Sequence, residues 1–509
     1  MKIVFVYTGE EYLGIEYLSA VLKQNGHQTQ LVYDPCLFDD YYVRNRFLSR
    51  KFNFKDTVIR EIIFSSADLV AFSVNTFEYS WACYLAKSIK KITDIPIVFG
   101  GHHATCMPEE VIANNHVDFL IQGEGEYALL ELVRYLEGKM DIEKIKNLYY
   151  KNDGRIYKNE LRPLIEELDN LPFADKDLFY SRLPYLSHNY TIMSSRGCPY
   201  SCSYCHNSYL KKLYQNKGIY LRRRTVNSVI KELKQRKQQY QINTVMFQDE
   251  IFTMDVAWLK EFSKQYKTEI GLPYACYIHP DHIDAHIIAL LRDSGCVSVN
   301  MGIESVNERV RKGLLQRFMP QAKIINAVNL LKKNSIHCRG YFIIGLPGQT
   351  EKDLIDIARF CSRYRFGTPM IFWLSYFPRT DIAEMANLKI NSHAMNRQKN
   401  KAISVGYALG GNSFDVKLSK LRFLIILTTL LNEKTIEYII KKKIYRFFPS
   451  RYQLLYIEIA KSLMRVYSFF ARKKNIGNTP RIAFMPIYKK YKYFMLNKFR
   501  RKCYKFLQK

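Results

Sequence analysis

The stretch Ser195-Arg196-Gly197-Cys198-Pro199-Tyr200-Ser201-Cys202-Ser203-Tyr204-Cys205 decides how the rest of the chain is interpreted. Its three cysteines, in CxxxCxxC spacing, directly follow a predicted strand, Thr191 to Ser194. Thiolates are the usual ligands of iron-sulfur clusters, and this short spacing lets three of them reach one cluster from a single loop. Three cysteines cannot satisfy four irons, so one iron would stay open to a substrate or cofactor. A Cys3His zinc site that uses His206 is the alternative.

On either side of this loop, short apolar runs alternate with helical stretches. Helices are predicted at Val226 to Gln239 and at Ile283 to Asp293, the second ending at Gly295. Six βα units predict an α/β architecture with a partial TIM-type (β/α)6 barrel, open on one side, whose site lies at the carboxyl ends of the strands. The predicted strands are Thr191 to Ser194, Thr244 to Phe247, Tyr274 to Tyr277, Val297 to Met301, Arg339 to Ile344 and Ile371 to Tyr376.

The N-terminal part carries a similar pattern, with helical stretches at Tyr12 to Gln24, Trp81 to Ile92 and Glu126 to Leu136. It predicts a doubly wound, Rossmann-like domain that binds its ligand beyond the carboxyl ends of its strands. The predicted strands are Lys2 to Tyr7, Thr29 to Tyr33, Leu69 to Ser73, Ile97 to Phe99 and Phe119 to Ile121. Their ends carry Thr8-Gly9, Ser73 to Thr76, Gly100 to His103 and Gly123 to Glu126.

Composition and the positions of prolines divide the chain further. Pro163, Pro172 and Pro184 interrupt any long periodicity between the two series. We therefore expect domains at 1–140 and 186–394, a linker or small subdomain at 141–185, and a basic, mainly helical region at 395–509. The net charge of +30 belongs mainly to this last region, because residues 416–509 contain 24 Lys or Arg against 3 Asp or Glu.

Several classes are disfavoured by what the sequence lacks. The first residues lead directly into a strand without the features of a signal peptide, so a cytoplasmic location is expected. The longest apolar run, Phe423 to Leu431, is shorter than the roughly 20 residues that cross a bilayer. Eleven cysteines, an odd number scattered through the chain, do not indicate a disulfide framework.

The cysteine loop, with Arg196-Gly197 before it and Tyr204 before the last cysteine, closely resembles the signature of the radical S-adenosylmethionine superfamily. In that family three cysteines bind a 4Fe-4S cluster, and the fourth iron chelates the amino and carboxylate groups of S-adenosylmethionine. The resemblance covers roughly residues 185 to 390. It implies that Cys198, Cys202 and Cys205 are the cluster ligands.

Three further segments fall on successive strand ends in the order that this resemblance requires. Phe247 to Phe252 resembles the acidic motif that meets the methionine ammonium, Met301 to Ser305 the GIES segment, and Phe342 to Thr350 the glycine motif of the fifth strand. A fourth segment, Tyr376 to Thr380, resembles the yPgT sequence but carries Arg379 where glycine is usual. The residues implied for S-adenosylmethionine are Tyr204, Asp249, Glu250, Glu304, Gly345 and Gly348.

The N-terminal domain resembles the cobalamin-binding domains that are fused to such enzymes. Gly100 to Thr105 is similar to their GGPHAT segment, and Gly123 to Glu126 to their GEGE segment. The DxHxxG motif of mutases is absent, as is common in this fused family, and a degenerate domain that binds nothing is the alternative. The residues implied for cobalamin are Thr8, Ser73, Gly100, Gly101, His102, Gly123 and Glu124, with His103 as a second candidate for cobalt or corrin contact.

The resemblance implies that an electron from the cluster cleaves S-adenosylmethionine to a 5′-deoxyadenosyl radical, and that cobalamin delivers a methyl group to an unactivated carbon. A radical cyclase or rearrangement enzyme without methylcobalamin is the second hypothesis, and a noncatalytic zinc or nucleic-acid-binding protein the third. The substrate could be a small molecule, a lipid or a peptide. The expected electron donor is external, such as a flavodoxin or ferredoxin.

Other polar segments have less specific interpretations. His279, His282 and His286 suggest a helix entry with exposed histidines rather than metal ligands. Arg222 to Arg224 could meet an acidic substrate or be solvated. Basic and aromatic residues alternate in Tyr488 to Phe494 and Phe499 to Phe506, which favours a peripheral anionic membrane surface ahead of a solvated face, and both ahead of nucleic acid.

Overall fold

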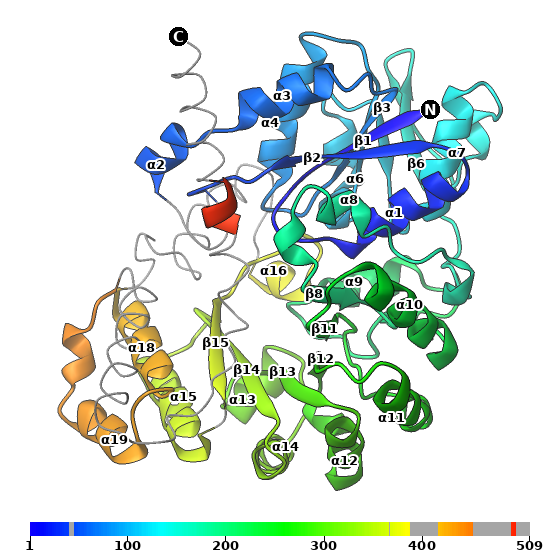
Figure 1. Ribbon diagram of the computed structural model, residues 1–509. Coiled ribbons are helices and arrows are strands. Elements are labelled where there is room, and N and C mark those ends of the chain that lie inside the picture. The colour runs from blue at the N-terminus through cyan, green and yellow to red at the C-terminus, as the bar shows by residue number, and fades with distance from the viewer. Residues whose placement is uncertain (40–44, 366, 387–415, 451–489, 495–509) are drawn as a thin grey trace, which may run out of the picture.

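The computed structural model describes residues 1–39, 45–365, 367–386, 416–450 and 490–494. Two sheets dominate the described chain, and the N-terminal sheet lies above the second sheet in Figure 1. The loop that carries the three cysteines joins the lower sheet on the side that faces the upper one. The fold thus places the two sites expected from the sequence opposite each other.

The N-terminal sheet has seven strands in the order β2-β1-β3-β4-β5-β6-β7. Strands β1 to β5 pair in parallel, and helices cover both faces, as in a doubly wound domain. Ile3 and Phe5 pack with α1 and α7 on one face, whereas Val4 and Val6 pack with α3 and α4 on the other. The parallel strands are β1 (Lys2–Thr8), β2 (Gln28–Asp34), β3 (Leu69–Ser73), β4 (Ile97–Gly100) and β5 (Phe119–Ile121). The helices are α1 (Leu13–Gln24), α2 (Arg46–Lys51), α3 (Lys55–Ile63), α4 (Tyr79–Lys90), α5 (His102–Cys106), α6 (Pro108–Ile112) and α7 (Glu126–Leu136).

Part of the segment expected as a linker extends this sheet. Strands β6 (Leu148–Asn152) and β7 (Arg155–Lys158) add to β5 in antiparallel fashion. The tight connection Asp153-Gly154 between them has both residues at positive φ, and it allows a hairpin within the segment that was expected to be a linker. The remaining residues before the second sheet include the short helix α8 (Asp177–Tyr180).

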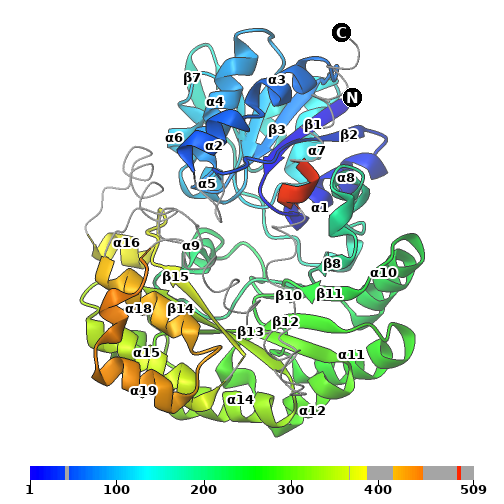
Figure 2. The same ribbon diagram turned by 60° about the vertical axis from the view of Figure 1, so that its left-hand side comes forward.

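The second sheet confirms the partial barrel. Its six strands are all parallel and follow the chain order β8-β11-β12-β13-β14-β15 across the sheet, with helices on the outer face (Figure 2). The strands are β8 (Asn189–Ile192), β11 (Thr244–Phe247), β12 (Tyr274–Ile278), β13 (Cys296–Glu304), β14 (His337–Ile344) and β15 (Thr368–Trp373). The helices are α10 (Val226–Gln239), α11 (Val256–Glu269), α12 (Ala285–Asp293), α13 (Glu308–Gly313), α14 (Gln321–Lys333) and α15 (Glu351–Tyr364).

The C-terminal part is helical where the structure describes it. Helix α16 (Asp381–Met385) follows β15, and α18 (Val416–Leu427) and α19 (Glu433–Lys441) pack against α15. Residues 490–494 return to the N-terminal sheet, where the Phe494 ring stacks on Tyr33 at 5.7 Å. Most of the basic and aromatic tail, including Phe499 to Phe506, lies outside the described residues. No helix in the described ranges is long and apolar enough to span a membrane.

A buried ion pair joins the N-terminal domain to the connecting segment. The Lys176 ammonium is fully buried and lies 2.7 Å from one carboxylate oxygen each of Glu11 and Glu16. Its nitrogen also lies 4.9 Å from the ring centre of Tyr190 in β8. Burial alone would lower the pKa of Lys176, but the two carboxylates outweigh burial and raise this pKa above its ordinary value.

We expect Lys176→Met to lower the free energy of unfolding by about 3–5 kcal/mol, because it leaves two buried carboxylates without their cation. The midpoint of chemical denaturation measures the change. Lys231→Met, on the exposed side of α10, is the matched control and should leave the midpoint unchanged. Equal midpoints for the two variants would contradict a structural role for this ion pair.

Candidate metal centre and interdomain cavity

The cysteine loop is held at both ends by local backbone structure. It runs from the short strand β9 (Ser195–Arg196) to helix α9 (His206–Leu213), and β9 pairs with β10 (Arg222–Arg223). Gly197 opens the loop at φ +94°, where a Cβ atom would lie 2.3 Å from the Tyr220 carbonyl oxygen. Only glycine fits this approach. Ser203, inside the loop, donates its backbone N–H to the Leu315 carbonyl at 3.1 Å.

The three thiols of this loop lie close enough to affect one another. Burial raises the pKa of Cys198 to about 11 and that of Cys205 to about 12, and the nearby Cys202 adds to both increases. A bound metal centre would reverse this balance, because its positive charge favours the thiolate form. No group of three His, Cys, Asp or Glu side chains in the described ranges is arranged to hold a single metal ion.

An arginine that no sequence motif indicated stands beside these thiols. Arg317 Nη1 lies 3.5 Å from the Sγ atom of Cys202 and 3.5 Å from the Tyr204 hydroxyl, and Nη2 donates to the Gly302 carbonyl at 2.7 Å. The side chain comes from the loop between α13 and α14. Because this contact links residues more than a hundred positions apart, only the folded structure reveals it.

The predicted acidic pair is divided by the fold. Asp249 is fully buried and accepts hydrogen bonds from Ser194 N at 3.1 Å, Ser194 Oγ at 2.5 Å and Ser195 Oγ at 2.5 Å. It therefore anchors the start of the cysteine loop. The Glu250 side chain instead lines a cavity, and the loss of water around its carboxyl group raises the pKa of Glu250 above the ordinary value.

The remaining residues expected near S-adenosylmethionine lie on the following strand ends. Glu304 is buried at φ +66° beside Tyr204 and Arg317; burial raises its pKa, which both neighbours partly offset. Gly345 follows β14 at φ +76°, with its backbone N–H 2.7 Å from Gln349 Oε1. Gly348 closes the same turn at φ +71°.

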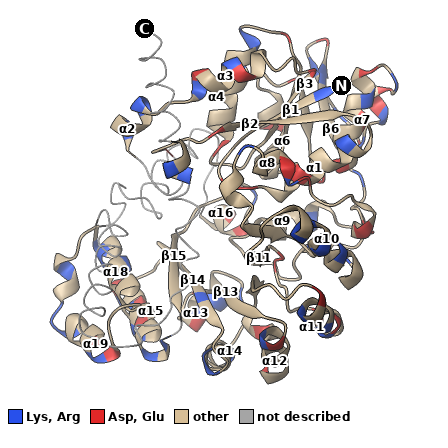
Figure 3. Cartoon of the chain, viewed as in Figure 1, with Lys and Arg blue, Asp and Glu red and all other residues tan. Residues whose placement is uncertain are grey.

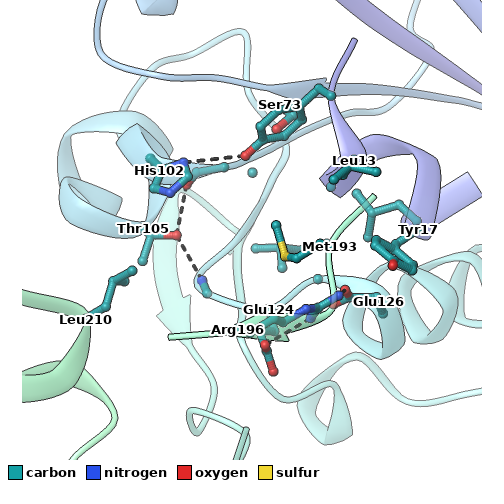
Figure 4. A pocket seen from close by; sticks show the side chains of 18 of the residues that line it. Leu13, Tyr17, Ser73, His102, Thr105, Glu124, Glu126, Met193, Arg196 and Leu210 are labelled. Atoms are coloured by element: carbon teal, nitrogen blue, oxygen red, sulfur yellow. Dashed lines mark hydrogen bonds and ion pairs between the residues drawn. The ribbon is translucent and has the colours of Figure 1, made fainter. Parts of the chain in front are cut away.

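A cavity of about 500 Å³ lies between the carboxyl edge of the N-terminal sheet and the cysteine loop (Figure 4). Both domains line it, with Gly197, Met193 and Glu250 from the barrel side. Thr8 is not among its lining residues and is buried. His103, the second candidate histidine, is also buried and is not among the lining residues. The remaining residues expected for cobalamin line the cavity: Ser73, Gly100, Gly101, His102, Gly123 and Glu124.

The two glycine loops at this edge are joined by a threonine that was not among the predicted site residues. Thr105 Oγ1 donates to the Gly101 carbonyl at 2.9 Å and accepts from Gly123 N at 3.0 Å. A Cβ atom on Gly101 would lie 2.8 Å from the Val74 nitrogen, and one on Gly123 would lie 1.8 Å from the Tyr214 hydroxyl. Both glycines therefore permit close packing at the rim of the cavity.

Glu124 ties the domains together. Arg196 donates to Glu124 Oε1 at 3.0 Å and to Glu126 Oε1 at 2.6 Å, and Arg222 donates to Glu124 Oε1 at 2.9 Å. Burial would raise the pKa of Glu124, but the two guanidinium groups outweigh burial and hold this pKa below its ordinary value. The carboxylate thus stays ionised between the domains.

The arginine triplet of residues 222–224 is not a solvated turn, which corrects that interpretation, and Arg222 lines the cavity. Arg222 and Arg224 are buried, and Arg224 donates to Glu232 at 2.6 Å. The Arg223 guanidinium lies 4.5 Å from the ring centre of Trp258. The triplet therefore packs the base of the cysteine loop.

Histidines from the two domains lie close together beside the cavity. His102 Nδ1 lies 3.5 Å from the Tyr12 hydroxyl, and the His102 ring centre lies 5.8 Å from that of His206. Burial lowers the pKa of His103 to about 4 and that of His206 to about 3. These rings are therefore neutral at physiological pH.

The interpretation of His279 as an exposed helix-entry residue is wrong. His279 is 3% exposed and stacks on Tyr200 of the cysteine loop at 4.1 Å. The helix entry itself is confirmed, since Asp284 caps α12 by accepting from Ile287 N at 2.8 Å. His286 is exposed, as expected.

Family comparisons agree with this arrangement of domains. Residues 192–361 match the model of the radical SAM superfamily, and residues 5–133 match the model of the B12 binding domain. The chain belongs to the radical S-adenosylmethionine superfamily and carries a B12-binding domain in front of its radical domain. A 4Fe-4S cluster, S-adenosylmethionine and cobalamin are the cofactors that the two domains imply.

The chain is similar to proteins of more than one named activity. It is 27% identical over 383 residues to an uncharacterized methyltransferase of Pyrococcus horikoshii. The aligned region covers 74% of this chain and 78% of the relative. It is 24% identical over 405 residues to an anaerobic magnesium-protoporphyrin IX monomethyl ester cyclase of Rubrivivax gelatinosus, over 74% and 68% of the two chains. The radical S-adenosylmethionine methyltransferase TsrM of Kitasatospora setae, solved with cobalamin and a [4Fe-4S] cluster, shares the fold at a TM-score of 0.60 and 18% identity. The match covers 76% of this chain and 78% of TsrM.

Proposed function

We propose that this chain is a cobalamin-dependent radical S-adenosylmethionine enzyme that methylates an unactivated carbon. The observation that carries the proposal is the cavity shared by the two domains, with His102 and Gly101 on one wall and Gly197 and Glu250 on the other. A cofactor in this cavity would lie between the B12-binding domain and the cysteine loop. The relative named as a methyltransferase supports the same reaction class.

Cys198, Cys202 and Cys205 would hold the cluster. Three thiols on one loop suit three irons of a 4Fe-4S cluster, and no disulfide engages them. When bound, the cluster supplies an electron that cleaves S-adenosylmethionine, and cobalamin supplies the methyl group. The residues of this chain orient these groups and keep water away.

The residues around the loop have charges that suit S-adenosylmethionine. Glu250, open to the cavity, would accept from the methionine ammonium, whereas Asp249 is committed to the two serines and supports the loop. A nearby ammonium would favour the ionised form of Glu250 despite its raised pKa. Tyr204, Glu304 and the turn of Gly345 to Gly348 would line the rest of this site.

A radical cyclisation or rearrangement without methylcobalamin is the second candidate, because the chain is also similar to a cyclase. Both candidates need a substrate and an external one-electron donor, for which a flavodoxin or ferredoxin is suited. A gain of one methyl group in the product favours the first candidate. An unchanged product mass favours the second.

We expect the chain, reconstituted with iron, sulfide and hydroxocobalamin, to form 5′-deoxyadenosine from S-adenosylmethionine under reducing conditions. Liquid chromatography with mass detection measures this product, and the corrin absorbance retained after gel filtration measures cobalamin. Cys202→Ala should abolish product formation, whereas Cys83→Ala on α4 should leave it intact. Formation of 5′-deoxyadenosine without retained corrin would reject the cobalamin-dependent reaction and leave the second candidate.

We expect Arg317→Gln to make the cluster harder to reduce, because the guanidinium beside Cys202 stabilises negative charge on the sulfur. A hydrogen bond to a charged group contributes about 1.5–3 kcal/mol. The ratio of reduced to oxidised cluster at a fixed potential should therefore fall about tenfold, which is ~59 mV for one electron. Electron paramagnetic resonance during redox titration, without S-adenosylmethionine, measures the ratio. Arg309→Gln, on the exposed side of α13, is the control. An unchanged ratio in Arg317→Gln would show that Arg317 does not stabilise the charge on the Cys202 sulfur.

We also infer a peripheral contact with anionic membranes. Lys441 to Lys443 and Arg446 are exposed at the end of α19 and directly after it, in a region where Figure 3 shows basic residues. The Phe447 side chain among them is 88% exposed. Lysines supply attraction to anionic headgroups, and an exposed aromatic ring can enter the interface.

We expect the chain to sediment with phosphatidylglycerol vesicles at low salt and not with phosphatidylcholine vesicles. Replacing Lys441 to Lys443 by glutamine and Phe447 by serine should reduce the bound fraction several-fold. The matched control replaces three exposed lysines elsewhere, Lys231, Lys260 and Lys264. Equal binding by the two variants would exclude this surface.

A further inference from the structure

The inner face of the barrel sheet carries polar residues in one row. Val299 and Met301 of β13, like Phe342 and Ile344 of β14, pack in the core with the helices of the outer face. Because successive side chains of a strand point to opposite faces, Asn300 and Arg339 point to the inner face.

The strand register defines the neighbours of Arg339. Asn300 pairs with Tyr277 on one side and with Arg339 on the other, so the three residues stand side by side across β12, β13 and β14. Tyr341, two residues beyond Arg339 on the same face, donates its hydroxyl to Asn300 Oδ1 at 3.3 Å.

Arg339 is half-buried, yet it makes no hydrogen bond and no ion pair with any part of the chain that the structure describes. Other buried arginines differ, since Arg224 donates to Glu232, and Arg317 to the Gly302 carbonyl. The Arg339 guanidinium nitrogens are not fully buried, so they remain accessible to an anionic ligand. Ser298 lies two residues before Asn300 on the same face of β13. Its buried hydroxyl also lacks a hydrogen-bond partner in the described chain.

Aromatic rings border this guanidinium. The Tyr341 ring is stacked with Phe372 of β15 at 5.3 Å between centres, with 8° between the ring planes. The Tyr277 ring centre lies 6.3 Å from that of Tyr341. The Tyr277 ring offers flat, apolar contact area to a planar ligand beside Arg339.

The row lies just below the cysteine loop. His279 is two residues beyond Tyr277 in extended backbone, so it is roughly 7 Å further along the same face. It stacks on Tyr200, between Cys198 and Cys202. A ligand held by Arg339 would therefore extend its other end towards the loop.

We propose that Arg339 anchors a carboxylate or phosphate group of the substrate, and that Tyr277 holds a planar, unsaturated portion of it next to the cysteine loop. This assignment of the substrate class rests on the proposed function, because it places the reacting carbon at the site of radical formation. Asn300 holds the Tyr341 hydroxyl and so acts as a positioning residue.

The experiment uses the full chain with its cluster reconstituted, and three probes: 2-naphthoate, its uncharged amide 2-naphthamide, and inorganic phosphate. Isothermal titration calorimetry should find that the wild type binds the carboxylate at least tenfold more tightly than the amide. Arg339→Gln should lose this preference, and Arg339→Lys should keep part of it. Competition by phosphate assigns a phosphate-bearing substrate, and its failure to compete assigns a carboxylate-bearing one.

The matched control is Arg309→Gln, whose arginine is exposed on α13, and it should bind as the wild type does. Equal affinity of the wild type for carboxylate and amide, or an unchanged preference in Arg339→Gln, would overturn the proposal. Cluster absorbance and the midpoint of chemical denaturation of Arg339→Gln should match those of the wild type, which separates a lost subsite from misfolding. A wild type that forms no 5′-deoxyadenosine would instead overturn the proposed function, and it would leave the probe comparison interpretable.

Discussion

The arrangement of the molecule depends on the ion pairs that Arg196 makes across the domain boundary. This arginine stands two residues before Cys198, and its guanidinium binds Glu124 and Glu126 of the N-terminal domain at 3.0 and 2.6 Å. Removal of one partner from a buried pair of this kind typically costs about 3–5 kcal/mol, because the remaining charge stays buried and uncompensated. The cysteine loop is therefore held against the carboxyl edge of the first sheet.

These ion pairs explain why the ligand sites of the two domains share one cavity. A doubly wound sheet and a parallel barrel both present their functional residues at the carboxyl ends of their strands. Here the two edges face each other, and the cavity between them is lined by the glycine loops of one domain and by Gly197 and Glu250 of the other. A methyl donor in the first domain and a radical formed in the second would thus need no long transfer.

Much of the fold was predictable from the sequence, because apolar runs and their spacing determine it locally. Strands Leu69–Ser73, Phe119–Ile121 and Thr244–Phe247 have the expected bounds, whereas the first and last barrel strands begin two or three residues earlier than expected. These two strands lie at the edges of the sheet, where each has one neighbour and pairing constrains its bounds least.

The candidate site was predictable where a motif lies on one short segment, and not where distant segments meet. The cysteine loop and the glycine loops could be located in this way. The interdomain role of Glu124, the contact of Arg317 with Cys202, and the burial of His279 under Tyr200 could not, because each joins residues far apart in the sequence. A lone carboxylate or arginine in a loop carries no local sign of its partner.

Magnetic coupling between the two cofactors tests the shared cavity most directly. The chain would be loaded with cob(II)alamin and its cluster reduced by one electron, and the electron paramagnetic resonance spectrum would be recorded at low temperature. We expect the cluster spin to broaden or split the cob(II)alamin signal, and the coupling to be lost when the cluster is oxidised. A spectrum that equals the sum of two independent signals would contradict this expectation.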